Sequence, residues 1–92
     1  MLPITQLKFL PKISGIYKVL DANGNVIYVG QAKNIHSRWN NGHHKFSEII
    51  AEYGIEAYID WAEIPEWLLN RAENAAISFY RPKLNSKTPP VV

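Results

Sequence analysis

The chain has 92 residues, a formal net charge of +2, 47% hydrophobic and 20% charged residues, and no cysteine. This size suits one small domain, and the composition is typical of a folded globular protein. The absence of cysteine excludes disulfides, thiolate zinc sites and a cysteine nucleophile. Because no apolar run approaches the roughly 20 residues that span a membrane, and the N-terminus lacks a signal-peptide pattern, we expect a cytoplasmic protein.

The first predicted elements are two strands, 14–20 and 26–30, whose residues alternate and are rich in Ile, Val, Leu and Tyr. Asn23-Gly24 lies between them and is a strong signal for a tight hairpin turn. A two- or four-residue loop centred on this turn fixes which residues face each other. The predicted opposite pairs are Tyr17 with Gly30, Val19 with Tyr28, and Leu20 with Ile27.

This register places two phenols on one face of the hairpin. Tyr17 and Tyr28 become diagonal neighbours, and Gly30 leaves space opposite Tyr17. A three-residue loop with a bulge would turn one strand over relative to the other, so the arrangement depends on the turn. The paired phenols are chemically useful only if a cation or a carboxylate lies nearby.

Two helices and a third strand are predicted after the hairpin. Asn34 is a suitable N-cap for a helix over 35–39. The next helix has an apolar stripe at helical spacing and ends at Gly54. Residues 55–62 alternate between apolar and polar side chains, which indicates a strand. The stripe of the second helix consists of Phe46, Ile49, Ile50 and Tyr53.

A final helix is predicted from Pro65 to about Tyr80, because proline favours the first turn of a helix. Its predicted core stripe consists of Leu68, Ala72, Ala75 and Phe79. The expected fold class is α+β: a three-stranded antiparallel sheet flanked by helices, in the order strand, strand, helix, helix, strand, helix. We expect a single domain over 1–92, with its core at about 13–86 and a flexible tail at 87–92.

Positive charge is concentrated in the stretch 33–45, which contains no acidic residue. Such asymmetry favours a polyanionic partner, although a net charge of +2 is low for a dedicated nucleic-acid-binding protein. A solvated surface with chance clustering explains the same pattern. The stretch holds three cations and all three histidines: Lys33, Arg38, Lys45, His36, His43 and His44.

Glu73 is unusual because no cation lies three or four positions away from it on the predicted helix. Those neighbours are Leu69, Asn70, Ala76 and Ile77, so an intrahelical ion pair is excluded. A carboxylate on this largely apolar surface either points to water or binds something positive.

Arg38 is the cation best suited to a phosphate, because its guanidinium forms two parallel hydrogen bonds and keeps its charge. Taken alone, an arginine at this position is more often a surface residue. His43 and His44 can transfer protons or simply form a polar loop. They are poor zinc ligands, because no thiolate supports them.

Together these residues resemble the GIY-YIG nuclease domain, a family that includes homing endonucleases, some restriction enzymes and the nuclease domain of the bacterial excision-repair incision subunit. The resemblance covers residues 13–86 and implies a divalent-metal-dependent endonuclease that hydrolyses DNA phosphodiester bonds. It rests on an ordered set of segments: Gly15-Ile16-Tyr17, Tyr28-Val29-Gly30, Arg38, Glu73 and Pro82-Lys83-Leu84-Asn85.

The resemblance implies a role for each principal residue. Tyr17 would be the general base beside the attacking water, and Tyr28 would position that water or the phosphate. Arg38 would contact the scissile phosphate. Glu73 would hold one divalent metal ion, Mg²⁺, with Mn²⁺ as a substitute. One carboxylate suits a Mg²⁺ ion that keeps most of its waters, and we do not expect a two-metal mechanism.

The same resemblance implies supporting roles for other residues. Asn85 would help to order the site, and His43 or His44 would assist catalysis. Gly15 and Gly30 would be structural residues of the two triplets.

Three positions depart from the family pattern. Val29 replaces a more frequent isoleucine, and Ala32 stands where many members have serine. Gln31 stands where repair-type members often have a lysine that could lower a tyrosine pKa. Because a free tyrosine has a pKa of about 10, Tyr17 needs a cation to act as a base. The general base therefore stays open between Tyr17 and a histidine.

We expect weak sequence specificity or structure-selective cleavage, because family members that read a DNA sequence usually carry an additional recognition domain. We expect one strand to be cut per active site, on branched, nicked or duplex DNA associated with the nucleoid. A homodimer or a partner protein would supply further specificity. Two alternatives remain: a weakly cleaving nucleic-acid-binding module of the same fold, and a protein-interaction domain that uses Trp39, Trp61 and Trp67.

Overall fold

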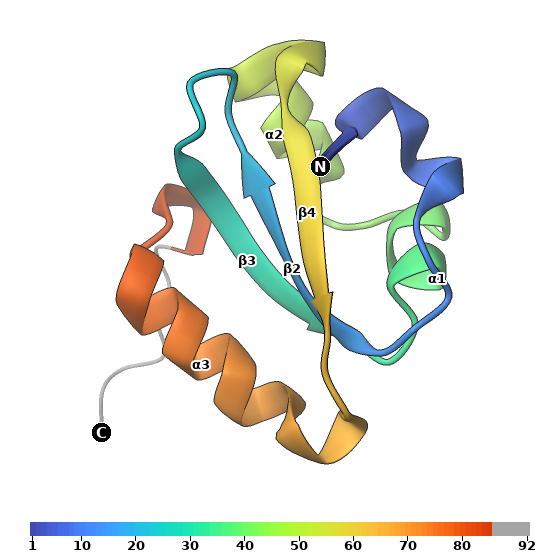
Figure 1. The fold of residues 1–92 in the computed structure, drawn as a ribbon. Helices are drawn as coiled ribbons and strands as arrows, with labels where there is room; N and C mark the ends of the chain where they lie inside the picture. Colours follow the sequence, from blue (N-terminus) through green and yellow to red (C-terminus); the bar gives the residue numbers. More distant parts are fainter. Residues whose placement is uncertain (86–92) are drawn as a thin grey trace.

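The computed structural model describes residues 1–85 and shows one antiparallel sheet with helices around it (Figure 1). The sheet order is β1-β4-β2-β3, so β3 forms one edge. The α+β class is confirmed, but the predicted strand number is too low by one, because a two-residue edge strand carries no periodic signal. The predicted tail at 87–92 lies outside the described residues. The strands are β1 (Leu2–Pro3), β2 (Gly15–Leu20), β3 (Val26–Ala32) and β4 (Tyr58–Glu63).

The helices follow the predicted order, with short 3₁₀ turns between several of them. Asn34 caps α1 as predicted, since its side chain accepts a hydrogen bond from the backbone N–H of Ser37 at 3.0 Å. The predicted strand over 55–62 begins later, at Tyr58, because η2 takes up the preceding residues. The α-helices are α1 (Ile35–Asn40), α2 (Phe46–Tyr53) and α3 (Leu69–Tyr80). The 3₁₀ turns are η1 (Ile4–Phe9), η2 (Gly54–Glu56), η3 (Glu66–Leu68) and η4 (Lys83–Asn85).

The β2–β3 hairpin has the predicted register around its two tyrosines. Tyr17 lies opposite Gly30, and Val19 lies opposite Tyr28. The two phenol rings are neighbours, with centroids 6.3 Å apart. Both phenols therefore lie on the same face of the sheet, as the turn sequence predicted.

The end of the hairpin differs from the prediction. A register shift between Val19 and Leu20 places Leu20 opposite Val26, so the predicted Leu20–Ile27 pair is wrong. The Asp21 carboxylate closes the turn by accepting two backbone N–H hydrogen bonds, both of 2.9 Å. Because the irregularity lies beyond the tyrosines, it does not alter which face they share.

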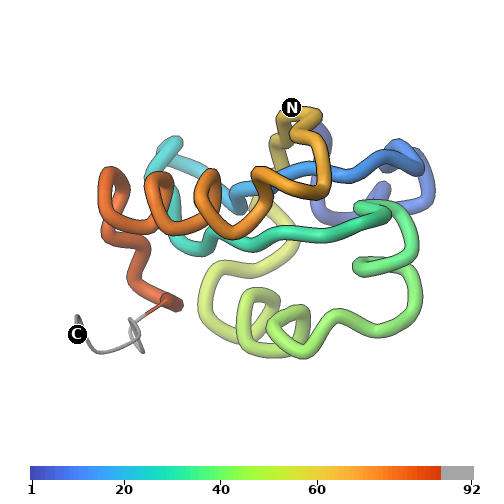
Figure 2. Tube along the Cα trace, turned by 90° about the horizontal axis from the view of Figure 1, so that it is seen from below, coloured from blue at the N-terminus to red at the C-terminus, as the bar shows by residue number. Residues whose placement is uncertain are grey.

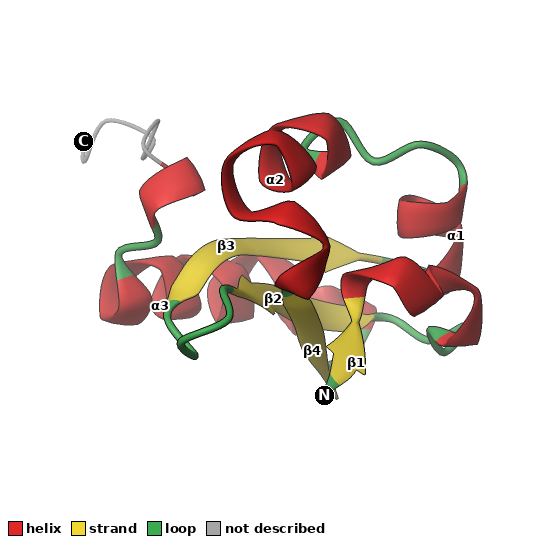
Figure 3. Cartoon of the chain, turned by 90° about the horizontal axis from the view of Figure 1, so that it is seen from above, coloured by secondary structure: helices red, strands yellow, loops and turns green. Residues whose placement is uncertain are grey.

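The helices α1 and α2 lie on one side of the strands (Figure 2), and α3 packs against β2 and β3. One face packs against α3, and the opposite face carries α1, α2 and η1 (Figure 3). Tyr17, Val19 and Ile59 from the strands, with Ile35 of α1 and Ile49 of α2, are at most 1% exposed. The tyrosine-bearing face is therefore a core face, and burial of this apolar area is the main stabilising contribution.

The predicted core stripe of the final helix is correct only in its first half, where Leu68 and Ala72 are partly buried. The 3₁₀ turn η3 precedes α3, so the helical phase begins at Leu69, which is 4% exposed. Ala75 and Phe79 are exposed, and Phe79 is 80% exposed. Counting in helical steps from Leu69 brings Glu73 and Ala76 to the partly buried side of the helix.

The N-terminal segment belongs to the core. Ile4 and Leu10 are 1% and 3% exposed, and the Ile4 backbone N–H donates to the Ala57 carbonyl at 2.9 Å. The core therefore begins before residue 13. Within residues 1–85, none of the helices combines the length and apolar character needed to cross a membrane.

Candidate active site

Tyr17 lies at the centre of the candidate site. Its side chain is 1% exposed, and its ring meets Trp39 edge-on at a centroid distance of 5.3 Å. A Cβ atom at Gly30 would overlap the Tyr17 phenol, and a Cβ at Gly15 would collide with the backbone of β4. The space that Gly30 leaves is thus filled by the Tyr17 ring. Both motif glycines permit close approach, which explains their structural role.

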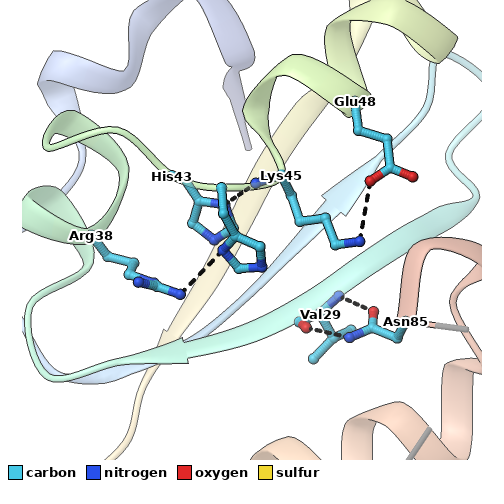
Figure 4. Close-up of polar contacts among 7 residues, drawn as sticks. Val29, Arg38, His43, Lys45, Glu48 and Asn85 are labelled. Atoms are coloured by element: carbon cyan, nitrogen blue, oxygen red, sulfur yellow. Dashed lines mark hydrogen bonds and ion pairs between the residues drawn. The ribbon is translucent and has the colours of Figure 1, made fainter. Parts of the chain in front are cut away.

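His43 forms a hydrogen bond with this phenol. Tyr17 Oη and His43 Nε2 are 2.7 Å apart. On the other side of the ring, the backbone N–H of Lys45 donates to His43 Nδ1 at 3.0 Å (Figure 4). Because Nδ1 accepts that bond, the neutral imidazole carries its proton on Nε2. His43 therefore donates to Tyr17 Oη. Trp39 stacks on the imidazole at 4.0 Å and 12°, which fixes the ring plane.

Burial keeps both members of this pair neutral near pH 7. It lowers the pKa of His43 to about 3, and the charges of Arg38, His44 and Lys45 act in the same direction. Burial and the neighbouring phenol raise the pKa of Tyr17, and the charge of Arg38 partly opposes this rise. In the resting site the phenol is protonated and the imidazole is uncharged.

Arg38 and His44 form the exposed side of the site. Arg38 lies in the last turn of α1, and its Nη2 lies 3.4 Å from His44 Nδ1 (Figure 4). The two adjacent histidines thus have different contacts: His43 meets the phenol, and His44 meets the guanidinium. Beside Arg38 lies an open groove of about 330 Å³, to which Lys33 adds a second positive charge.

Glu73 lies on α3, and its carboxylate accepts a hydrogen bond from a neutral amide. Gln31 Nε2 donates to Glu73 Oε1 at 2.9 Å and to Asn70 Oδ1 at 2.7 Å. Within residues 1–85, Glu73 forms no ion pair. Its negative charge acts with burial to raise the pKa of both Tyr17 and Tyr28.

Asn85 orders the strand that carries Tyr28. Its side-chain Oδ1 accepts from the Val29 backbone N–H at 2.8 Å, and its Nδ2 donates to the Val29 carbonyl at 2.9 Å (Figure 4). Because β3 is an edge strand, these backbone groups would otherwise lack a partner within the sheet. The side chain therefore replaces a neighbouring strand at this point.

Direct contacts bring together the two predicted tyrosines, both histidines and Arg38. Glu73 is joined to β3 through Gln31, and Asn85 binds the edge of β3. Trp39 and Asn70 were not predicted as site residues. Trp39 is 3% exposed and touches both Tyr17 and His43, so it is not available to a surface partner. Asn70 lies three residues before Glu73, and this spacing on one helix face was the signal that could have identified it.

Comparison with protein families decides the identity of the fold. The model of the UvrC-like GIY-YIG domain matches residues 13–86, most of the chain. The chain belongs to the UvrC-like GIY-YIG domain family. The predicted family and the predicted enzyme class, a GIY-YIG-type nuclease, are thereby confirmed.

Curated relatives of this GIY-YIG domain include UvrABC system protein C from two Psychrobacter bacteria. The protein from Psychrobacter sp. (strain PRwf-1) is 31% identical over 84 residues, which cover 91% of this chain and 13% of that protein. The protein from Psychrobacter cryohalolentis is 37% identical over 83 residues, which cover 83% of this chain and 13% of that protein. The chain thus spans 13% of the length of these relatives.

Solved structures show the same GIY-YIG architecture. The GIY-YIG N-terminal endonuclease domain of UvrC from Thermotoga maritima, bound to magnesium as its catalytic divalent cation, has a TM-score of 0.69 and 26% identity. The match covers 86% of this chain and 90% of that one. A tyrosine-to-phenylalanine variant of that domain, also bound to its catalytic divalent cation, has the same TM-score and identity.

The residues of this GIY-YIG domain fit a single hard cation and not a multidentate cage. In the described part of the chain, no group of three or more His, Cys, Asp or Glu side chains is arranged to hold a metal. Glu73 offers one carboxylate that forms no ion pair within residues 1–85. This donor set suits a Mg²⁺ ion that retains most of its waters.

Proposed function

We propose that this domain is a divalent-metal-dependent endonuclease that hydrolyses DNA phosphodiester bonds, one strand per active site. The supporting observation is the Tyr17–His43 hydrogen bond, placed where Arg38 and Glu73 exert opposite electrostatic effects on the phenol. Phosphodiester hydrolysis needs a proton acceptor, a cation beside the phosphate and a metal ligand. These residues supply all three.

Glu73 would hold Mg²⁺, and Mn²⁺ is expected to substitute for it. An ion held there would supply Lewis-acid stabilisation of the charge that develops on the phosphate and the leaving oxygen. The magnesium bound by the Thermotoga maritima domain supports this choice. Arg38 adds a positive charge that does not depend on a titratable proton.

His43 is suited to hold Tyr17 in place and not to take the proton itself. Its Nδ1 accepts from Lys45, and its Nε2–H donates to Tyr17 Oη. Neither nitrogen is free to accept a proton from water. We therefore assign the general base to Tyr17, whose pKa must fall when a cation binds nearby. The charge of the resulting phenolate is stabilised by the hydrogen bond from His43.

Tyr28, His44 and Asn85 would complete the site. Tyr28 is 7% exposed, and its ring centroid lies 5.6 Å from that of His43, so it can orient the water or the phosphate beside Tyr17. His44 would steady the Arg38 guanidinium, and Asn85 would hold the strand beneath Tyr28.

We propose weak sequence specificity or structure selectivity toward branched, nicked or duplex DNA. The curated relatives are named as components of a UvrABC system, which supports recognition that is supplied by a partner protein. Because one active site cuts one strand, cleavage of the second strand could be supplied by a second copy of the chain. A DNA substrate would place the protein in the cytoplasm, with the nucleoid.

The test is nicking of a supercoiled plasmid in Mg²⁺, with linear and branched substrates in parallel. The wild type should nick only with metal, and Tyr17→Phe and Glu73→Ala should lose at least about 100-fold in rate. Tyr58→Phe and Glu56→Ala are matched controls on exposed surface and should keep the wild-type rate. Wild-type rates in both site variants would contradict the residue assignment. Salt-sensitive DNA binding without cleavage in Mg²⁺ or Mn²⁺ would instead identify a binding module.

A further inference from the structure

We propose that Gln31 is a positioning residue for the metal ligand: its neutral amide orients the Glu73 carboxylate while leaving that carboxylate's charge available to a divalent cation. This inference rests on the proposed function, because it takes Glu73 as the metal ligand. It concerns the position at which this chain departs from the lysine that repair-type members often carry.

The hydrogen bonds fix the orientation of the Gln31 amide. Its Nε2 lies 2.9 Å from Glu73 Oε1 and 2.7 Å from Asn70 Oδ1. An amide nitrogen carries two protons, so both bonds can form at once. The opposite orientation would set the Gln31 carbonyl oxygen against a carboxylate that can only accept, and this would be repulsive. Glu73 is thus held at one oxygen by a defined donor.

The placement of Gln31 joins the two halves of the site. Gln31 belongs to β3, next to Gly30 and three residues after Tyr28, whereas Glu73 and Asn70 belong to α3. Residues three apart on a helix share a face, so one amide contacts the same helix face at two points. The tether therefore fixes α3 relative to the strand that carries one of the phenols.

The neutrality of the tether matters for cation binding. A lysine ammonium beside Glu73 would pair with the carboxylate and compete with a divalent cation for it. The hydrogen bond from the Gln31 amide orients the carboxylate without adding positive charge, and within residues 1–85 no cation forms an ion pair with Glu73. Groups that orient a metal ligand in this way typically contribute about 10- to 100-fold to metal affinity.

The experiment measures Mn²⁺ affinity by electron paramagnetic resonance, using the whole 92-residue chain without DNA. Gln31→Met keeps the side-chain length but removes the donor, and Gln31→Lys keeps a donor but adds a charge. We expect both to weaken Mn²⁺ binding about tenfold. Gln6→Met, at an exposed position of η1, is the matched control and should bind like the wild type.

Thermal unfolding without metal separates positioning from a general structural role. Gln31→Lys should fold, because the position is only partly buried, so it keeps the test valid if Gln31→Met does not. A lowered melting temperature with wild-type Mn²⁺ affinity in Gln31→Lys or Gln31→Met would overturn the inference. If Glu73→Gln binds Mn²⁺ as well as the wild type, the metal-ligand assignment fails instead, and this is a separate outcome.

Discussion

Lowering the pH from 7 to 5 should destabilise the wild-type domain more than a His43→Asn variant. In the unfolded chain His43 has its ordinary pKa of 6.5, whereas burial in the folded site lowers the pKa to about 3. The unfolded state therefore binds the extra proton as the pH falls below 6.5, and stability falls with it. Between the unfolded-state pKa of 6.5 and pH 5 lie about 1.5 pH units. At about 1.4 kcal/mol per unit, the free energy of unfolding falls by about 2 kcal/mol.

The assay is urea unfolding at pH 7, 6 and 5, followed by tryptophan fluorescence. The amide oxygen of the asparagine introduced in the variant can still accept the Lys45 N–H hydrogen bond, but the side chain does not titrate. The other histidines are present in both proteins, so their contributions cancel in the comparison of slopes. Parallel pH dependences for the two proteins would refute a buried, neutral His43.

Three further predictions concern the strands and the charged groove. Gly30→Ala should lower the free energy of unfolding by about 1–3 kcal/mol, because the new methyl group overlaps the buried Tyr17 phenol. Chemical denaturation measures this loss, and unchanged stability would contradict it. Asn85→Ala should cost about 1–3 kcal/mol and speed hydrogen exchange at the Val29 amide, whereas unchanged exchange would contradict the edge-strand role. Lys33→Gln should reduce the slope of log affinity for duplex DNA against log salt by about 0.9 in fluorescence anisotropy. Lys8→Gln outside the groove serves as its control, and equal slopes for the two variants would remove the groove from the DNA-binding surface.

The hairpin could be predicted from the sequence because its information is local. Asn23-Gly24 set the turn, and alternation placed Tyr17 opposite Gly30. The sequence could not decide whether the hairpin carries a bulge, because alternation alone does not show a register shift such as the one at Leu20. A two-residue strand such as β1 is likewise too short to leave a pattern.

In the final helix, an error of one residue in the predicted start changes which side chains are predicted to be buried along its whole length. The predicted stripe was counted from Leu68, but η3 delays the start of α3, so Leu69 is buried and Phe79 is exposed. Each residue advances the helix by about 100°, so a shift of one position turns a different set of side chains inward. Glu73 could nevertheless be identified as a candidate site residue, because the absence of a cation three or four positions away does not depend on which face of the helix is buried.

The candidate site residues could be predicted from the sequence, but their contacts could not. Adjacent loop residues have no periodicity that would show which of His43 and His44 faces the phenol. The fold decides this, because Trp39 stacks on His43 and the Lys45 backbone fixes its tautomer. The bond from Gln31 to Glu73 joins residues 42 positions apart and likewise depends on how α3 packs against β3.

Single-turnover cleavage of supercoiled plasmid by Tyr17→Phe, compared with the wild type in saturating Mg²⁺, tests the central claim most directly. Loss of the phenolic oxygen removes the proton acceptor while leaving Glu73 and Arg38 in place. We predict a loss of at least about 100-fold in the cleavage rate, with the Mg²⁺ concentration dependence unchanged. A Tyr17→Phe enzyme that cuts at the wild-type rate would contradict the assignment of Tyr17 as the general base.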